Sequence, residues 1–214
     1  MNKNESASGR ILTIALAAIL VSAVCAIADD FSPPPWERNT DGTTFQKWSF
    51  DASAAKGPMA PDESYNIYGE PLLRVDTTAD WNQGAWPLTG EIDMIIPNRP
   101  DSGPDSYKEI WLQLTWEAAG LDPFVWDRPV VGLETNPLYE GVEIHRSDMD
   151  LGNDWTHTLF EIRVWPNPRE EWIAIKGDIV VDQVVVDTRC VPEPGSLSLL
   201  GLAAWLGLRR RQRV

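Results

Sequence analysis

Cysteine is scarce in this chain of 214 residues, which contains only Cys25 and Cys190. Cys25 lies in an N-terminal segment that we expect to be removed, so the body of the protein keeps Cys190 alone. An internal disulfide is therefore excluded, although an exported chain meets conditions that permit one. Cys190 is either a structural residue or a link to another chain, and the sequence leaves both open.

Positive charge is also scarce, with 18 Lys and Arg residues against 32 Asp and Glu residues. Between residues 29 and 190 there are 12 basic and 30 acidic side chains, which gives a net charge of about −18. Nucleic acid and anionic lipid are bound through cations placed at phosphates. We therefore expect neither as a partner of the body.

Motifs for cofactor chemistry are missing. The two histidines, His145 and His157, have no Cys or HExxH partner at ligand spacing, so neither a zinc site nor a nucleophilic triad is indicated. A P-loop and a dinucleotide fingerprint are also missing. We expect no cofactor, apart from the calcium alternative considered below.

Long apolar runs are missing as well: the two that exist have 14 residues each and lie at the ends. The first, Ile11–Val24, follows a polar segment with Lys3 and Arg10 and precedes the small-x-small pattern Ala26-Ile27-Ala28. This layout predicts a secretory signal peptide over residues 1–28, cut by signal peptidase after Ala28. An uncleaved anchor is the alternative, but 14 residues are short for a permanent span.

The second apolar run, Gly195–Leu208, follows Pro192-Glu193-Pro194 and precedes Arg209, Arg210, Arg211 and Arg213. As a helix it covers roughly 21 Å, less than a hydrocarbon core of ~30 Å, so it spans only with help from flanking residues or local thinning. The arginines favour a cytoplasmic C-terminus. A short transmembrane helix is therefore predicted.

These residues resemble the tail of PEP-CTERM proteins, which have a Pro-Glu-Pro motif, a short transmembrane helix and an Arg-rich end. The resemblance implies processing near Pro192-Glu193-Pro194 by an exosortase-type sorting enzyme. It also implies anchorage in the inner membrane by the helix before processing, and afterwards a place at the cell surface or in an extracellular polysaccharide matrix. The stretch from Asp154 to Cys190 is similar to the terminal part of uncharacterised members of this family.

The body, residues 29–190, is rich in Gly and Pro between short runs of β-forming residues. This pattern predicts an all-β domain, a jelly-roll-like β-sandwich of two sheets, between an N-terminal signal helix (1–28) and a sorting tail (191–214). Long loops are expected at Pro97–Pro104 and Gly120–Pro137. The candidate strands are Phe45–Phe50, Leu72–Asp76, Glu91–Ile96, Glu109–Trp116, Gly141–His145, Trp155–Trp165, Trp172–Lys176 and Ile179–Thr188.

Two of these strands have distinct faces, because side chains alternate sides along a strand. Their core faces are expected to carry Ile110, Leu112, Leu114 and Trp116 on one strand and Thr158, Phe160, Ile162 and Val164 on the other. The opposite faces mix tryptophans with polar groups, which suits stacking on a sugar ring and hydrogen bonding to its hydroxyls. The expected ligand-binding residues are Trp111, Gln113, Trp155, His157, Arg163 and Trp165. The alternative is that the tryptophans are structural and fill the core.

Two acidic motifs remain. Gly90-Glu91-Ile92-Asp93 resembles the start of the catalytic signature of laminarinase-type glycosidases, but Ile95 and Ile96 occupy the positions where the second catalytic Glu should fall. The loop containing Asp148, Asp150 and Asp154 offers carboxylates suited to calcium, although it does not match the EF-hand pattern. An ordinary Asp- and Gly-rich turn explains this loop equally well.

The sequence therefore predicts an exported envelope or matrix protein without enzymatic activity, possessing a face that binds extracellular polysaccharide. Its rivals are a glycan-active enzyme with Glu91 and Asp93 in its cleft and a purely structural surface protein.

Overall fold

The computed structural model of the chain describes residues 30–50, 57–76, 85–99, 106–119, 130–133 and 141–192. In these ranges every regular element is a β-strand, which confirms the all-β prediction. The strands lie in one compact unit that begins at Ser32. The predicted signal helix and C-terminal helix fall outside the described residues.

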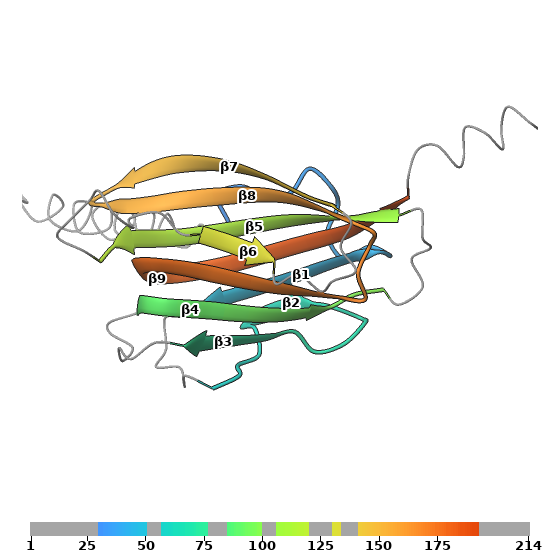
Figure 1. Cartoon of the computed structure of the whole chain (residues 1–214), viewed down its shortest axis with the longest axis horizontal. Helices are drawn as coiled ribbons and strands as arrows, with labels where there is room; N and C mark the ends of the chain where they lie inside the picture. Colours follow the sequence, from blue (N-terminus) through green and yellow to red (C-terminus); the bar gives the residue numbers. More distant parts are fainter. Residues whose placement is uncertain are drawn as a thin grey trace, which may run out of the picture. The chain divides into compact units, whose positions relative to one another are not determined.

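The strands are joined edge to edge in a single sheet, and all their pairings are antiparallel (Figure 1). Hydrogen-bonded neighbours follow the order β2-β1-β9-β5-β8-β7, while β4 and β6 also pair with β9 and β3 pairs with β4. The strands are β1 (Thr43–Ser49), β2 (Glu63–Tyr65), β3 (Leu72–Asp76), β4 (Trp86–Pro97), β5 (Ser106–Ala118), β6 (Val130–Leu133), β7 (Gly141–Gly152), β8 (Trp155–Trp165) and β9 (Glu170–Pro192).

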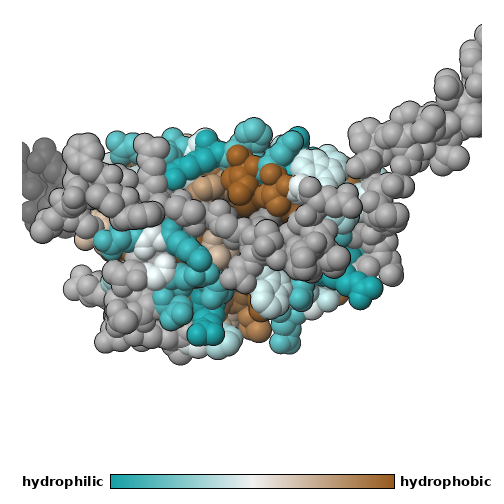
Figure 2. Space-filling model, viewed as in Figure 1, coloured by the Kyte–Doolittle hydropathy of each residue, from teal (hydrophilic) through white to brown (hydrophobic). Residues whose placement is uncertain are grey.

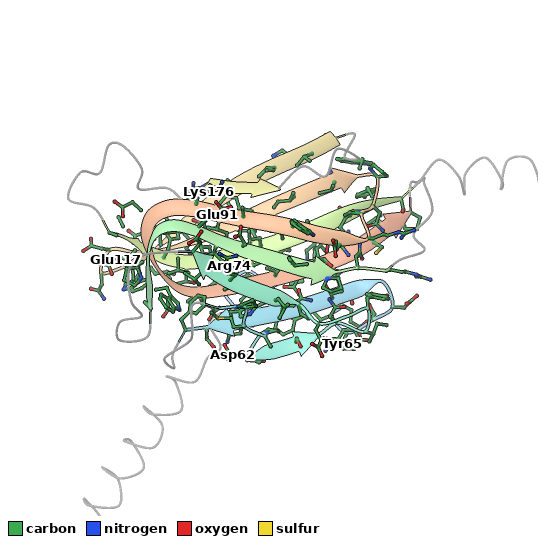
Figure 3. The ribbon with its side chains drawn as sticks, turned by 60° about the horizontal axis from the view of Figure 1, so that its bottom comes forward. Asp62, Tyr65, Arg74, Glu91, Glu117 and Lys176 are labelled. Carbon is green, nitrogen blue, oxygen red and sulfur yellow. The ribbon has the colours of Figure 1, made fainter. Side chains whose placement is uncertain are left out.

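The long strand β9 changes partners along its length. Its first half pairs with β4 and β6, and its second half pairs with β1 and β5. The register with β5 shifts between Thr115 and Trp116, which leaves Asp182 of β9 as an extra residue; such bulges bend a strand. Figures 1 and 3 show β9 turning back on itself. The pairing thus forms one continuous open sheet, and the two-sheet sandwich stays a prediction.

The core is built from the faces that alternation predicts. Ile110, Leu112 and Leu114 of β5 are at most 1% exposed, and Phe160, Ile162 and Val164 of β8 are at most 3% exposed. They belong to one cluster of buried apolar side chains that also includes residues of β3, β4 and both halves of β9. A single core therefore holds the two halves of β9 and their partner strands together, since burial of apolar area is the main stabilising contribution.

Several elements differ from the sequence-based expectation, among them β2, which was not a candidate strand, and β4, which begins at Trp86 instead of Glu91. The stretch expected to be a loop, 120–137, contains the short strand β6, and β9 continues through residues 177–178, where a break between two strands was expected. Ladder pairing explains the continuity, because Gly177 and Asp178 lie opposite Gly90 and Thr89 of β4.

On the face drawn in Figure 2, a hydrophobic area lies among hydrophilic residues in the upper part, the region where β7 and β8 run in Figure 1. Val142 and Ile144 of β7 are 38% and 42% exposed. They lie opposite the buried Val164 and Ile162 of β8. The edge strand β7 therefore extends the apolar face of β8 outward to solvent.

Candidate ligand-binding surface

The outer face of β5 and β8 carries the six residues predicted to bind ligand, spread over most of its length. In the register of this pair, Trp111 lies opposite Glu161, Glu109 opposite Arg163, and Gln113 opposite Leu159. At about 3.3 Å per residue, Trp155 and Trp165 at the two ends of β8 are roughly 33 Å apart. One sugar unit cannot contact all six, so the face divides into parts.

The part around Gln113 and His157 is covered by the protein itself. Gln113 and His157 are each 1% exposed. The N-terminal segment (residues 32–38) lies over them: the Ser32 N–H donates to Gln113 Oε1 at 3.0 Å, and Ser32 Oγ lies 3.2 Å from His157 Nε2. These two side chains therefore position the N-terminal segment and are not open to a ligand.

The same segment places a second indole beside Trp111. Trp111 Nε1 donates to the Ser32 carbonyl oxygen at 2.6 Å. The rings of Trp36 and Trp111 meet edge to face, with centroids 5.8 Å apart and an interplanar angle of 78°. This arrangement is the one that the ring quadrupoles favour. Both indoles remain half-buried.

A cavity of about 230 Å³ opens beside these two indoles. Of the six predicted residues, only Trp111 and Arg163 line it. The other charged or aromatic lining residues are Trp36, Glu109, His145, Glu161 and Arg189. Pockets for drug-sized ligands typically have roughly 300–1,000 Å³, so this volume suits a smaller unit.

Glu109 contacts two arginines that line the cavity. Its Oε2 accepts from Arg189 Nε at 2.5 Å, and its Oε1 lies 3.3 Å from Arg163 Nε. The guanidinium of Arg189 also lies 4.6 Å from the centre of the Trp36 ring, a cation–π contact. Arg163 keeps 51% of its side chain exposed, so its remaining donors face solvent.

Arg38 at the end of the N-terminal segment ties it to the sheet. Its Nε and Nη2 donate to the two carboxylate oxygens of Asp187 at 2.5 and 2.6 Å, and its guanidinium lies over the Phe45 ring at 4.3 Å. The Asp187 side chain is fully buried and the Arg38 side chain is 24% exposed. A bidentate charged pair of this kind fixes the segment in position and in orientation.

Trp155 and Trp165 lie outside the cavity, at opposite ends of β8. Trp165 stacks on Tyr107 of β5, with ring centroids 5.3 Å apart. Trp155 lies opposite Glu117, next to the turn between β7 and β8. Both are half-buried, so each offers part of an aromatic surface near one end of the face.

The predicted calcium ligands do not gather in the structure. Asp148 Oδ1 accepts from Arg146 Nε and Thr158 Oγ1, both at 2.8 Å, and Asp150 Oδ1 accepts from the Gly152 N–H at 2.7 Å. Asp154 has a φ of 68°, in the tight turn between β7 and β8. Among the described residues, no three Asp, Glu, His or Cys side chains are grouped to hold a metal ion. These carboxylates serve the hairpin, as the turn alternative expects.

Glu91 and Asp93 lie on another part of the sheet, the outer side of β4. Glu91 Oε2 lies 3.0 Å from Lys176 Nζ, and Figure 3 shows the two residues side by side. Burial raises the pKa of Glu91, but hydrogen bonds with Lys176 and Asp93 outweigh it and hold the pKa below the usual range. An apolar cavity of about 300 Å³ adjoins Asp93 and is also lined by Leu72, Arg74 and the 44%-exposed Trp172.

The C-terminal end of β9 leads from this sheet into the tail. Pro192, the last residue of β9, lies opposite Ser106 of β5. Glu193, Pro194, Arg209, Arg210 and Arg211 lie outside the described residues. In the described ranges, no helix has the length and apolar character needed to cross a membrane.

Residues 191–212 match the family model of the PEP-CTERM protein-sorting motif. The tail is a PEP-CTERM sorting motif. It marks the protein as an exported surface protein whose C-terminus is processed by an exosortase. Comparison with curated proteins and with solved structures gave no match.

Alternation along the strands could have identified part of the cavity, because it places Glu109 and Glu161 on the same face as Trp111 and Arg163. Trp36 had no such signal, since it lies in an irregular segment far from β5 in the sequence. Arg189 could be placed there only from the pairing of β9 with β5, where it lies opposite Glu109.

Proposed function

We propose that this PEP-CTERM protein is a non-enzymatic polysaccharide-binding module of the cell surface or extracellular matrix. After removal of residues 1–28 by signal peptidase, the helix of the tail would hold it in the inner membrane until the exosortase acts. The body, a jelly-roll-like sandwich around one core, would then bind extracellular polysaccharide through the cavity beside Trp36 and Trp111.

The pair of indoles beside a set of ordered charged groups carries this proposal. An indole offers a flat apolar surface for a sugar ring, and guanidinium and carboxylate groups hydrogen-bond to its hydroxyls. Glu109, Arg163 and Arg189 fix one another in the cavity, so they need little reorganisation when a ligand binds. Trp155 and Trp165 extend the surface toward the ends of β8 and suit an extended chain of sugars.

The enzymatic alternative has less support. A retaining glycosidase needs a protonated carboxylic acid beside an ionised carboxylate, with the two groups about 5 Å apart. Hydrogen bonds with Lys176 and Asp93 lower the pKa of Glu91 and favour its ionised form, which suits the nucleophile alone. The protonated acid lacks a candidate in the signature, because Ile95 and Ile96 occupy the positions where the second catalytic Glu should fall. A measured release of reducing sugar that is lost in Glu91→Gln would favour the enzyme over the binding module.

The proposal can be tested by calorimetric titration of the purified protein with a panel of extracellular polysaccharides. We expect saturable binding to at least one of them, and a Kd about 10- to 100-fold higher in Arg163→Ala, because a hydrogen bond to a charged group contributes about 1.5–3 kcal/mol. Arg74→Ala, beside the apolar cavity of the β3–β4 face, is the matched control. Loss of binding in Arg74→Ala alone would move the site to that face. A lack of binding to every polysaccharide would favour a structural surface protein.

A further inference from the structure

A buried polar cluster lies apart from the ligand-binding cavity, where the core approaches the C-terminal end of β9. Its members are Asn98, just after β4, Lys108 on the core side of β5, and Glu171 and Cys190 from the two halves of β9. Lys108 and Glu171 are 0% exposed and Asn98 is 3% exposed. Charged side chains are almost never buried to this extent without a specific arrangement.

The Lys108 amine lies directly against the Asn98 amide. Lys108 Nζ is 2.5 Å from Asn98 Oδ1 and 3.3 Å from Glu171 Oε1. The Lys108 nitrogen therefore contacts both a carboxamide and a carboxyl group in a site closed to water. Holding reactants in this way replaces a rare encounter with a prearranged one.

The Asn98 amide is held on both of its polar atoms. Oδ1 accepts from the Arg99 N–H at 2.7 Å and from Cys190 Sγ at 3.2 Å, in addition to Lys108. Nδ2 donates to Asn167 Oδ1 at 2.7 Å and to the Pro168 carbonyl oxygen at 2.6 Å. Donors placed on the oxygen stabilise the negative charge that develops when a nucleophile attacks the amide carbon.

We propose that Lys108 and Asn98 condense into an intramolecular isopeptide bond, with Glu171 as the group that transfers the protons. Lys108 Nζ attacks Asn98 Cγ, the new Nζ–Cγ bond forms, and the Cγ–Nδ2 bond breaks. Glu171 passes a proton from Nζ to Nδ2, which leaves as ammonia. The step changes no oxidation state and needs no co-reactant.

The protonation of Glu171 agrees with this role. Burial raises the pKa of Glu171, and the nearby Lys108 ammonium lowers it by less than burial raises it. The raised pKa favours the protonated carboxylic acid, which is the form that can give a proton to the leaving nitrogen. The attack itself uses the lone pair of an unprotonated amine.

The bond would join the end of β4 to the start of β5 beside the exit of the tail. Lys108 lies opposite Cys190 in the β5–β9 pair, and Ser106 lies opposite Pro192. The link would therefore fasten two strands next to the point where β9 leaves the body for the tail.

Peptide mapping of the purified full chain tests the bond without any variant. A protease that cuts before aspartate separates residues 93–100 from residues 105–121, because Asp93, Asp101, Asp105 and Asp122 are the cleavage points. We expect the two peptides to be recovered joined, lighter by one ammonia than their sum, with tandem fragmentation placing the link at Asn98 and Lys108. Recovery of the two unmodified peptides as separate species would overturn the proposal.

Variants then assign the roles. Asn98→Asp should give the same joined product with loss of water in place of ammonia. Lys108→Arg should give the two peptides as separate species. In the exposed control Lys176→Arg, the two peptides should remain joined. Glu171→Gln should slow the joining about 10²-fold or more, as expected when a proton-transfer group is removed. Joining of Glu171→Gln at the rate of the unmodified sequence would contradict the role of Glu171. Circular dichroism of each variant distinguishes a specific loss of joining from misfolding.

Discussion

Glu171→Gln should change how the stability of the protein depends on pH. Glu171 is completely buried, and burial raises the pKa of its carboxyl above the ordinary value of 4.5. The folded protein therefore holds this proton to higher pH than the unfolded chain does. As pH rises from about 4.5 toward the folded pKa, the unfolded state releases the proton first, and the free energy of unfolding falls.

The magnitude follows from the transfer of one proton. The contribution of Glu171 lowers the free energy of unfolding by at most about 1.4 kcal/mol per pH unit in that window. Glutamine cannot titrate, so the difference in free energy of unfolding between the protein and Glu171→Gln should change with pH by this slope. The difference should become constant below and above this pH window. For a domain of this size, each pH unit corresponds to a shift of about 3–6 °C in the difference between their Tm values.

Urea denaturation followed by tryptophan fluorescence, repeated from about pH 4 to pH 8, measures this difference. Glu143→Gln makes the same chemical change at an exposed position of β7 and is the matched control. An isopeptide bond at Lys108 would add a constant amount to the difference in free energy of unfolding between the two proteins. The sign of the slope of this difference against pH would stay unchanged. Parallel curves for the protein and for Glu171→Gln would refute the argument that burial controls this carboxyl.

Three further predictions concern the N-terminal segment, the core and the tail. Arg38→Met leaves the buried Asp187 without its bidentate partner and should lower the free energy of unfolding by about 3 kcal/mol in urea denaturation. The control Arg99→Met, whose ion pair with Asp41 is exposed, should lower it by less than about 1 kcal/mol. Equal losses in the two variants would contradict the argument from burial. Ile162→Ala should lower the free energy of unfolding by about 2–5 kcal/mol in thermal unfolding. Ile144, its cross-strand neighbour, is 42% exposed, so Ile144→Ala should cost much less. Similar Tm shifts in the two variants would show that β7 is covered. Deletion of residues 192–214 should abolish C-terminal processing, which immunoblots of cell fractions detect; unchanged processing would contradict the role of the tail.

Much of the fold could be predicted from local patterns. The bounds of β3 and β8 agree with the sequence-based expectation, because each is an alternating run set apart by residues that break strands. β7 was expected to end at His145, with Asp148–Asp154 in a loop, but the strand continues to Gly152 through pairing with β8. An edge strand with polar residues forms because its neighbour supplies the hydrogen bonds, which local propensity does not encode.

Long-range pairing accounts for what the sequence could not show. Gly177-Asp178 looks like a turn, yet the ladder with β4 carries β9 through it, and a bulge at Asp182 turns the strand to new partners. The burial of Gln113 and His157 under Ser32 depends on an irregular segment 81 and 125 residues away in the sequence. Alternation placed these side chains on the right face but gave no indication that the chain itself covers them.

The most direct test of the proposed function is co-sedimentation of the purified protein with insoluble extracellular polysaccharide from the producing cells. The account predicts saturable co-sedimentation that falls about 10-fold or more in Arg163→Ala and is retained in Arg74→Ala. A protein that stays in the supernatant at every concentration of polysaccharide, while remaining folded by circular dichroism, would contradict the account.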